Sequence, residues 1–185
     1  MFKYILVCLV PFFLYAQSGV LLRVIDGDTL LLKTQEGFSI CQASFIDAPE
    51  AIENDKLDRE LRKCNISKEY ALSGGEASKE FVNALLQKSI SYSFEITRVL
   101  PNQNPVCDIK LPKKTQPDLH PRFSEVLVEN GFALPYIIHA DEKREEELLK
   151  IAKFAKKEKR GLWKTHHDLM MCLVYQRYSL RSLRE

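Results

Sequence analysis

The sequence lacks an excess of charge of either sign. Its 185 residues include 27 Lys and Arg against 25 Asp and Glu, which gives a formal net charge of +2. A protein that attracts nucleic acid through its overall charge is therefore excluded, and any such binding must come from local basic patches. The sequence also lacks internal repeats, low-complexity tracts and linkers, so its length predicts one folded domain.

The sequence has no apolar run long enough to cross a membrane. Its N-terminal run, Tyr4 to Leu14, follows Lys3 and precedes Tyr15-Ala16. This pattern predicts a secretory signal over residues 1–16 that is cleaved after Ala16. We therefore expect an exported protein, periplasmic or secreted, with no membrane attachment after cleavage and with 26 basic against 25 acidic residues remaining. An uncleaved N-terminal anchor is the alternative, because Leu14 is not a small residue.

Cysteine is scarce, and its spacing does not suit a metal site. Removal of the signal takes away Cys8 and leaves an even number of cysteines: Cys41, Cys64, Cys107 and Cys172. In an oxidising compartment an even number predicts disulfides, and four thiols allow several pairings. Four unpaired thiols are the alternative.

The spacing of apolar residues predicts an α+β fold. Five strands are expected, over residues 20–25, 30–33, 38–45, 89–99 and 106–111. Helices are expected over residues 73–86, 123–130 and 141–160. The first helix is predicted to begin at Ser73, because Ser73 and Glu76 have the capping-box spacing. The charged stretch 51–72 is expected to be a loop or a partly helical flap. Five strands with interleaved helices predict a five-stranded OB-type β-barrel capped by about three helices.

Two short acidic runs carry the clearest chemical signal. Ile-Asp-Gly-Asp-Thr at 25–29 and Ile-Asp-Ala-Pro-Glu at 46–50 each lie at the edge of a predicted strand. Carboxylates that gather at one point repel one another by several kcal/mol unless a cation lies between them. Such a cluster predicts a hard metal that prefers oxygen ligands, and Ca²⁺ is the expected ion. Two surface turns are the alternative, because Asp-Gly is a common hairpin signal.

Further motifs follow the acidic runs in a fixed order. The full set is Val-Ile-Asp-Gly-Asp-Thr-Leu at 24–30, Phe-Ile-Asp-Ala-Pro-Glu at 45–50, Gly-Gly-Glu-Ala-Ser at 74–78, Glu-Asn-Gly-Phe-Ala at 129–133 and Lys-Lys-Glu-Lys-Arg-Gly-Leu-Trp at 156–163. In this order the motifs resemble the staphylococcal nuclease, or thermonuclease-like, family. The resemblance implies an OB-fold domain over residues 17–168, a C-terminal extension over 169–185 that adds one more helix, and calcium-dependent phosphodiesterase ancestry. It also implies DNA or RNA as the partner, and we expect a monomer.

The resemblance assigns roles to the acidic residues. By motif match, Asp28 and Asp47 are predicted to bind Ca²⁺, and the carbonyl of Ala48 to add a ligand. Glu50 is predicted to position the attacking water, with Asp26 in a supporting role. Phosphodiester hydrolysis needs such a water, a base beside it, and positive charge on the phosphoryl oxygens.

The sequence departs from the family at the residues that supply this positive charge. The family has one Arg on the third strand and another before the fifth. The matching catalytic positions here hold Gln42 and Asn104, with Val106 as the alternative to Asn104 if the register shifts by two. One preorganised donor to a charged transition state is worth roughly 10²- to 10³-fold in rate. The loss of two such donors predicts weak hydrolysis.

Other side chains are candidates for nucleic-acid contact. Lys113, Lys114, Arg177 and the run 156–160 are expected to track phosphates, or else to be solvated surface charges. Tyr136 is a candidate for base stacking, with packing as the alternative.

The family barrel also favours one cysteine pairing. Cys41 and Cys107 fall on strands that are neighbours there, so a disulfide between them is expected, which leaves Cys64 for Cys172.

Two functional hypotheses follow. The first is an exported, Ca²⁺-dependent nuclease with weakened hydrolysis, which the retained acids favour. The second is a catalytically inactive domain that binds nucleic acid or a protein partner, which the missing arginines favour.

Overall fold

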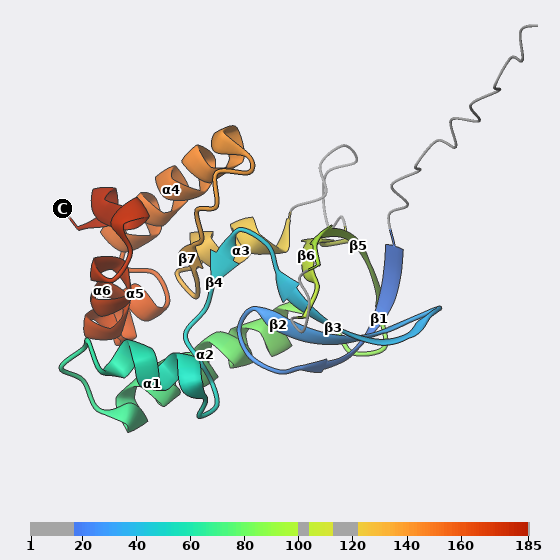
Figure 1. Ribbon diagram of the computed structural model, residues 1–185, viewed down its shortest axis with the longest axis horizontal. Helices are drawn as coiled ribbons and strands as arrows, with labels where there is room; N and C mark the ends of the chain where they lie inside the picture. Colours follow the sequence, from blue (N-terminus) through green and yellow to red (C-terminus); the bar gives the residue numbers. More distant parts are fainter. Residues whose placement is uncertain (1–16, 100–103, 113–121, 185) are drawn as a thin grey trace, which may run out of the picture.

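The computed structural model describes residues 17–99, 104–112 and 122–184, so the predicted signal over residues 1–16 lies outside the described part. Five strands close a barrel in the order β1-β2-β3-β6-β5 (Figure 1). Their bounds are β1 Gln17–Val24, β2 Thr29–Thr34, β3 Gly37–Ala43, β5 Ser91–Arg98 and β6 Val106–Lys110. The predicted α+β class with a five-stranded OB-type barrel is confirmed.

The barrel strands form because their apolar residues alternate. Leu30 and Leu32 on β2 are buried, as are Tyr92 and Phe94 on β5, while the residues between them are more exposed. Strand β2 pairs antiparallel with β1 and β3, whereas β3 pairs parallel with β6. The turn between β2 and β3 requires Gly37, whose φ of 126° is rarely adopted by other residues.

The helices gather on one side of the barrel (Figure 1). They are α1 Asp55–Leu61, α2 Lys68–Leu85, α3 Phe123–Glu129, α4 Glu142–Lys157, α5 Leu162–Thr165, α6 His167–Tyr175 and the 3₁₀ helix η1 Tyr178–Leu183. Two short strands, β4 Ile46–Asp47 and β7 Leu134–Pro135, pair with each other beside the barrel. The charged stretch 51–72 is thus partly helical, and helices are more numerous than the sequence led us to expect.

Helix α2 begins earlier than the predicted Ser73. It starts at Lys68, after an N-cap at Ser67. The capping-box prediction was wrong because the glycines after Ser73 serve close packing rather than a helix start. A Cβ on Gly75 would lie 1.9 Å from the main-chain oxygen of Glu50, so α2 lies directly against the second acidic run.

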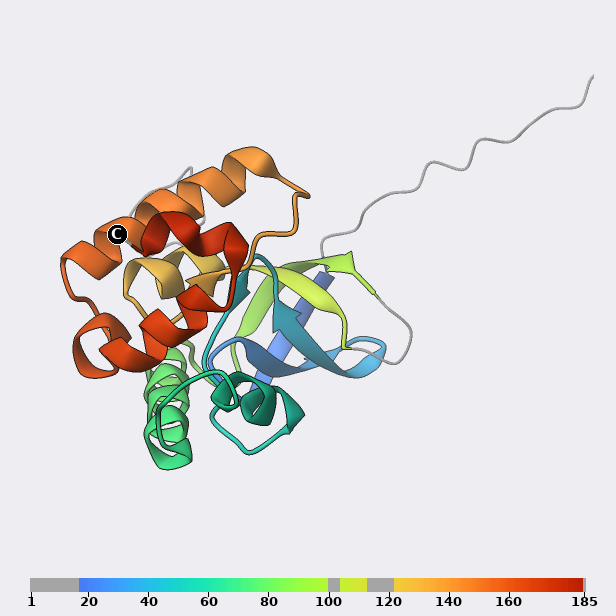
Figure 2. The same ribbon diagram turned by 60° about the vertical axis from the view of Figure 1, so that its left-hand side comes forward.

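The C-terminal residues are part of the packed core. Helix α6 buries Leu173 and Val174, and η1 buries Leu180 and Leu183. Figure 2 shows η1, in dark red, lying alongside α4, and α6 packs against η1. No helix in the described ranges is long and apolar enough to cross a membrane.

Two disulfides join segments that are far apart in the sequence. Cys41 on β3 is bonded to Cys107 on β6, and their Cα atoms are 5.8 Å apart. Cys64, after α1, is bonded to Cys172 on α6, with a Cα separation of 5.8 Å. The first links neighbouring barrel strands, and the second holds the C-terminal helices beside α1.

Candidate functional site

The first acidic run forms the turn between β1 and β2. The main-chain N–H of Asp28 donates to Asp26 Oδ1 at 3.1 Å, and the Asp28 carbonyl oxygen accepts from the Ala43 N–H at 2.7 Å. A Cβ on Gly27 would lie 2.1 Å from Ser78 Oγ on α2. Only glycine therefore allows the turn to pack this closely on the helix.

The second acidic run lies beside the first. Asp47 is on β4, which β7 holds in place, and the Ala48 N–H donates to Asp28 Oδ2 at 2.9 Å. The side chains are buried, with residue exposures of 4% for Asp28, 7% for Asp47 and 8% for Glu50. The fold thus brings the two runs together. We call Asp26, Asp28, Asp47 and Glu50 the acid cluster.

Two cations of the chain itself contact the acid cluster. Lys56 is in the first turn of α1, where its Nζ lies 2.5 Å from Asp47 Oδ1 and also contacts Glu50 Oε1. Arg177, the residue before η1, contacts Asp47 Oδ2 and lies 3.6 Å from Glu60 Oε1. The C-terminal segment therefore reaches the acid cluster.

Negative charge is in surplus even with both cations in place. Burial and the charges of Asp26 and Asp47 raise the pKa of Asp28 well above its ordinary value. Burial also raises the pKa of Glu60 to about 7, with the charge of Lys56 acting against the shift. Burial by itself lowers the pKa of Lys56, but the surrounding carboxylates outweigh it and raise that pKa overall. Lys56 is therefore a permanent cation of the site.

Every carboxylate oxygen of Asp28, Asp47 and Glu50, the three most buried members of the acid cluster, already accepts a hydrogen bond. The donors are the Thr29 hydroxyl and the Ala48 N–H to Asp28, Lys56 and Arg177 to Asp47, and Lys56 and Asn54 to Glu50. Within the described ranges, no group of three or more His, Cys, Asp or Glu side chains is arranged to hold a metal ion. Asp47, one of the expected calcium ligands, does not fit Ca²⁺ in this arrangement, because Lys56 and Arg177 hold both of its carboxylate oxygens. The oxygens of Asp28 accept from two neutral donors, the Thr29 hydroxyl and the Ala48 N–H.

A cleft of about 390 Å³ borders the acid cluster. Its polar lining includes Gln42, Asp47, Lys56, Arg59, Arg98 and Tyr136. The guanidinium groups of Arg59 and Arg98 are exposed, and neither has an acidic partner within ion-pair distance in the described part of the chain. The main-chain N–H of Tyr136 donates to the Phe45 oxygen at 2.8 Å, and Tyr136 is 44% exposed. The cleft therefore combines free positive charge with an accessible aromatic ring.

The residues predicted to contact nucleic acid are not all in this cleft. Gln42 and Tyr136 line it, whereas Asn104 is exposed just before β6 and does not line it. Lys113 and Lys114 lie outside the described residues. Gln42 is paired with Val106 across β3 and β6, so the third-strand position faces the cleft without a charge.

Sequence reasoning missed the cations that the structure places here. Lys56 and Arg59 are three residues apart on α1, and this spacing puts them on one helix face. An Asn54 N-cap right after the acidic run was the signal that predicts this helix, since its side chain accepts from the Leu57 N–H at 2.9 Å. Arg177, which was expected to track phosphates, instead contacts Asp47, and no local signal indicates a partner that lies 130 residues away in the sequence.

A family model described as staphylococcal nuclease homologue matches residues 42–165. The match covers the second acidic run, α1 and most of the helices, and leaves the first acidic run and Arg177 outside. No curated protein matches the sequence.

Proposed function

Because this chain belongs to the family of staphylococcal nuclease homologues, we propose that it is an exported nucleic-acid-binding protein whose acid cluster is partly neutralised by two of its own cations, Lys56 and Arg177. The family in general binds nucleic acid and depends on Ca²⁺. The observation that carries the proposal is the pairing of Asp47 with both Lys56 and Arg177. An ammonium and a guanidinium then provide the positive charge that buried carboxylates require.

The cleft beside the acid cluster is suited to a strand of nucleic acid. Arg59 and Arg98 offer guanidinium donors to phosphate oxygens, and Gln42 adds a neutral donor. Tyr136 offers a ring face to a base. A base stacks on such a side chain only when it is unpaired, so the proposed ligand is single-stranded.

Hydrolysis is disfavoured at this site for two reasons. A general base must accept a proton from water, but both oxygens of Glu50 already accept hydrogen bonds, from Lys56 and from Asn54. In addition, the family's two arginine positions hold Gln42 and Asn104. Binding without efficient cleavage is the consequence.

An exported, Ca²⁺-dependent nuclease with weakened hydrolysis is the second candidate. The convergence of Asp28, Asp47 and Glu50 in one buried cluster favours it. So does the surplus of negative charge, which raises the pKa of Asp28. Export is common to both candidates, and it is supported by the predicted N-terminal signal and by two disulfides, which suit an oxidising compartment.

A binding assay and a digestion assay together test the proposal. We expect a labelled single-stranded oligonucleotide to bind equally well in Ca²⁺ and in EDTA, with no calcium-dependent cleavage. The double variant Arg59→Gln with Arg98→Gln should weaken binding and reduce the slope of log affinity against log salt by about 1.4, because each lost phosphate contact removes about 0.7.

The matched control is Arg23→Gln with Lys88→Gln, which removes the same charge from exposed positions outside the cleft. Binding by this control should keep the wild-type slope. Slow digestion of the oligonucleotide that requires Ca²⁺ and stops in EDTA would instead establish the second candidate. Equal weakening in both double variants would show that the cleft is not the binding site.

A further inference from the structure

A second cavity lies in the helical layer, at the junction of α4, α5, α6 and η1. Its volume is about 670 Å³, and no residue that lines it also lines the cleft beside the acid cluster. Five lysines surround it: Lys153, Lys156, Lys157, Lys159 and Lys164. We call this cavity the lysine groove.

The lysine groove has little internal charge compensation. Lys156 donates from Nζ to the main-chain oxygen of Leu183 at 2.6 Å. The other four ammonium groups have no acidic partner within ion-pair distance in the described ranges, although Glu158 lies among them in the sequence. These four lysines are exposed, so their charge is available to a partner.

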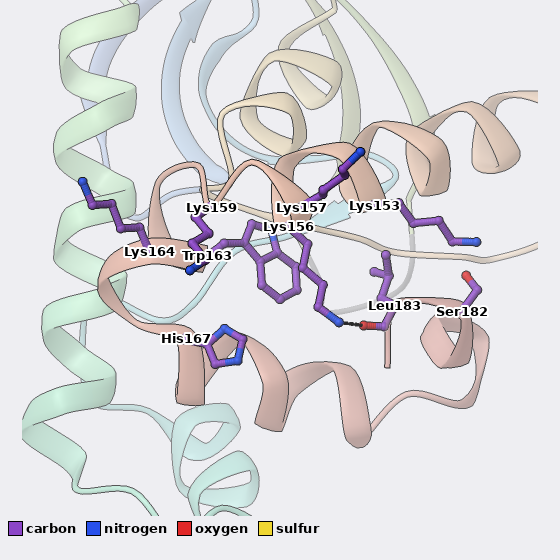
Figure 3. A pocket seen from close by; sticks show the side chains of 9 residues that line it. All are labelled: Lys153, Lys156, Lys157, Lys159, Trp163, Lys164, His167, Ser182 and Leu183. Atoms are coloured by element: carbon purple, nitrogen blue, oxygen red, sulfur yellow. Dashed lines mark hydrogen bonds between the residues drawn. The ribbon is translucent and has the colours of Figure 1, made fainter. Parts of the chain in front are cut away.

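The floor of the groove is aromatic and apolar. Trp163 and Leu183 line it and are almost completely buried, at 2% and 1% exposure. The Nε1–H of Trp163 is buried and has no hydrogen-bond partner among the described residues. A buried donor without an acceptor carries a desolvation cost, and the contacts within the described residues do not offset it here. Figure 3 shows the imidazole of His167 near the indole ring, at the edge of the same space.

The arrangement of the lysines indicates the kind of anion. Figure 3 shows their ammonium ends spread around the groove, with Lys153 and Lys164 at opposite sides, instead of pointing at one spot. A single small anion needs converging donors, whereas a chain of phosphates needs cations in a row. Rings beside the cations suit an unpaired base.

We propose that the lysine groove is a second binding site for single-stranded nucleic acid, separate from the cleft. Phosphates of the strand lie along the exposed lysines, and a base packs against His167 and the rim of Trp163. That the lysine groove binds a polyanion is inferred from the groove alone. That this polyanion is nucleic acid rests on the proposed function.

Trp163 is the only tryptophan in the chain, so its fluorescence reports directly on the lysine groove. The experiment titrates the protein with a single-stranded oligonucleotide of about twenty nucleotides, in EDTA and at low salt. We expect a saturable change in Trp163 emission that weakens as salt is added. Lys153→Gln with Lys159→Gln should reduce the salt slope by about 1.4, since two phosphate contacts are lost.

Two sets of variants separate this site from the cleft and from overall charge. Lys33→Gln with Lys88→Gln removes the same charge from exposed positions on barrel strand β2 and in the turn before β5, and should leave the emission titration unchanged. Arg59→Gln with Arg98→Gln should keep the emission change at saturation, even where it weakens total binding. A groove signal that persists when cleft binding fails would retain this proposal and overturn the proposed function alone.

Several outcomes would overturn the proposal. They are no change in Trp163 emission at saturating oligonucleotide, equal loss in the groove and barrel variants, and an equal response to inorganic phosphate at the same phosphate concentration. A response to vesicles of anionic lipid with none to the oligonucleotide would also overturn it and identify a membrane surface instead.

Discussion

The acid cluster and the lysine groove show how burial decides whether a charge is paired inside the protein. In the acid cluster the carboxylates are buried, and Asp47 alone receives both Lys56 and Arg177. In the lysine groove the ammonium groups are exposed, and most have no acidic partner among the described residues. Buried charges must be paired with opposite charges of the protein itself, because their desolvation is costly. Exposed charges are stabilised by water and stay available to a binding partner.

The difference between the acid cluster and the lysine groove also bears on function. Lys56 and Arg177 supply positive charge to the buried carboxylates of this site, and we propose that the acid cluster has a structural role. The positive charge that remains available lies elsewhere, in the cleft arginines and in the lysine groove.

Loss of the Lys56 ammonium should have the largest effect. Lys56→Met leaves Asp47 and Glu50 buried without their shared cation, and we expect the free energy of unfolding to fall by about 2–4 kcal/mol. Urea denaturation at pH 7 in EDTA measures the change. The control is Lys68→Met, because Lys68 pairs only with exposed acids, at 3.0 Å from Glu53 and 3.7 Å from Asp58. It should leave stability nearly unchanged, and equal losses in the two variants would refute the distinction.

Loss of the Arg177 guanidinium should have a smaller effect of the same kind. Arg177 contacts one member of the acid cluster, where Lys56 contacts two. We expect Arg177→Met to lower the free energy of unfolding by about 1–3 kcal/mol. Arg181→Met, four residues further on and exposed, is the control for the same denaturation experiment. A stability equal to wild type in Arg177→Met would show that the contact with Asp47 does not hold in solution.

The pKa of Glu60 predicts a modest dependence of stability on pH. Burial raises this pKa from 4.5 to about 7, so the folded protein binds the proton more tightly than the unfolded chain does. The contribution of Glu60 to the free energy of unfolding is on the order of 1–2 kcal/mol and is fully present below pH 4.5. It is lost as the pH rises to about 7. Glu60→Gln should remove this part of the pH profile. Thermal melts from pH 4 to 8 test it, and an unaltered profile in the variant would contradict the assignment.

Removal of charge from the lysine groove should have the smallest effect on stability. Lys153→Gln with Lys159→Gln breaks no ion pair in the described ranges, so the melting temperature should stay near that of wild type. Oligonucleotide binding by the same variant should weaken. A variant that loses both stability and binding would show that these lysines stabilise the fold and do not serve only to bind a partner.

Most of the barrel was predictable because its signals are local. Alternating apolar residues and Gly37 specify the hairpin of β2 and β3. The acidic runs lie at strand ends, and the positions of those ends place the two runs. The α2 start was misjudged because the local capping pattern at Ser73 competes with a tertiary requirement. A side chain at Gly74 would lie 2.5 Å from Leu169 Cδ2 on α6, and no local pattern contains that contact.

The candidate site was predictable only in its acids. Asp28, Asp47 and Glu50 follow from motif order, and the structure brings them together. Their cations were not predictable in the same way, because nothing near Arg177 in the sequence indicates a partner on β4. The family resemblance also directed attention to positions 42 and 104, whereas the positive charge of the cleft comes from α1 and the end of β5.

We propose that the Lys56 ammonium takes the place of a metal ion beside Asp47, a predicted calcium ligand. The most direct test compares the melting temperatures of wild type and Lys56→Met in Ca²⁺ and in EDTA. The account predicts no calcium-dependent shift in wild type and a clear upward shift in Lys56→Met, because the freed carboxylates bind the ion in the folded state only. An equal upward shift in wild type, or no shift in the variant although it folds, would contradict the account.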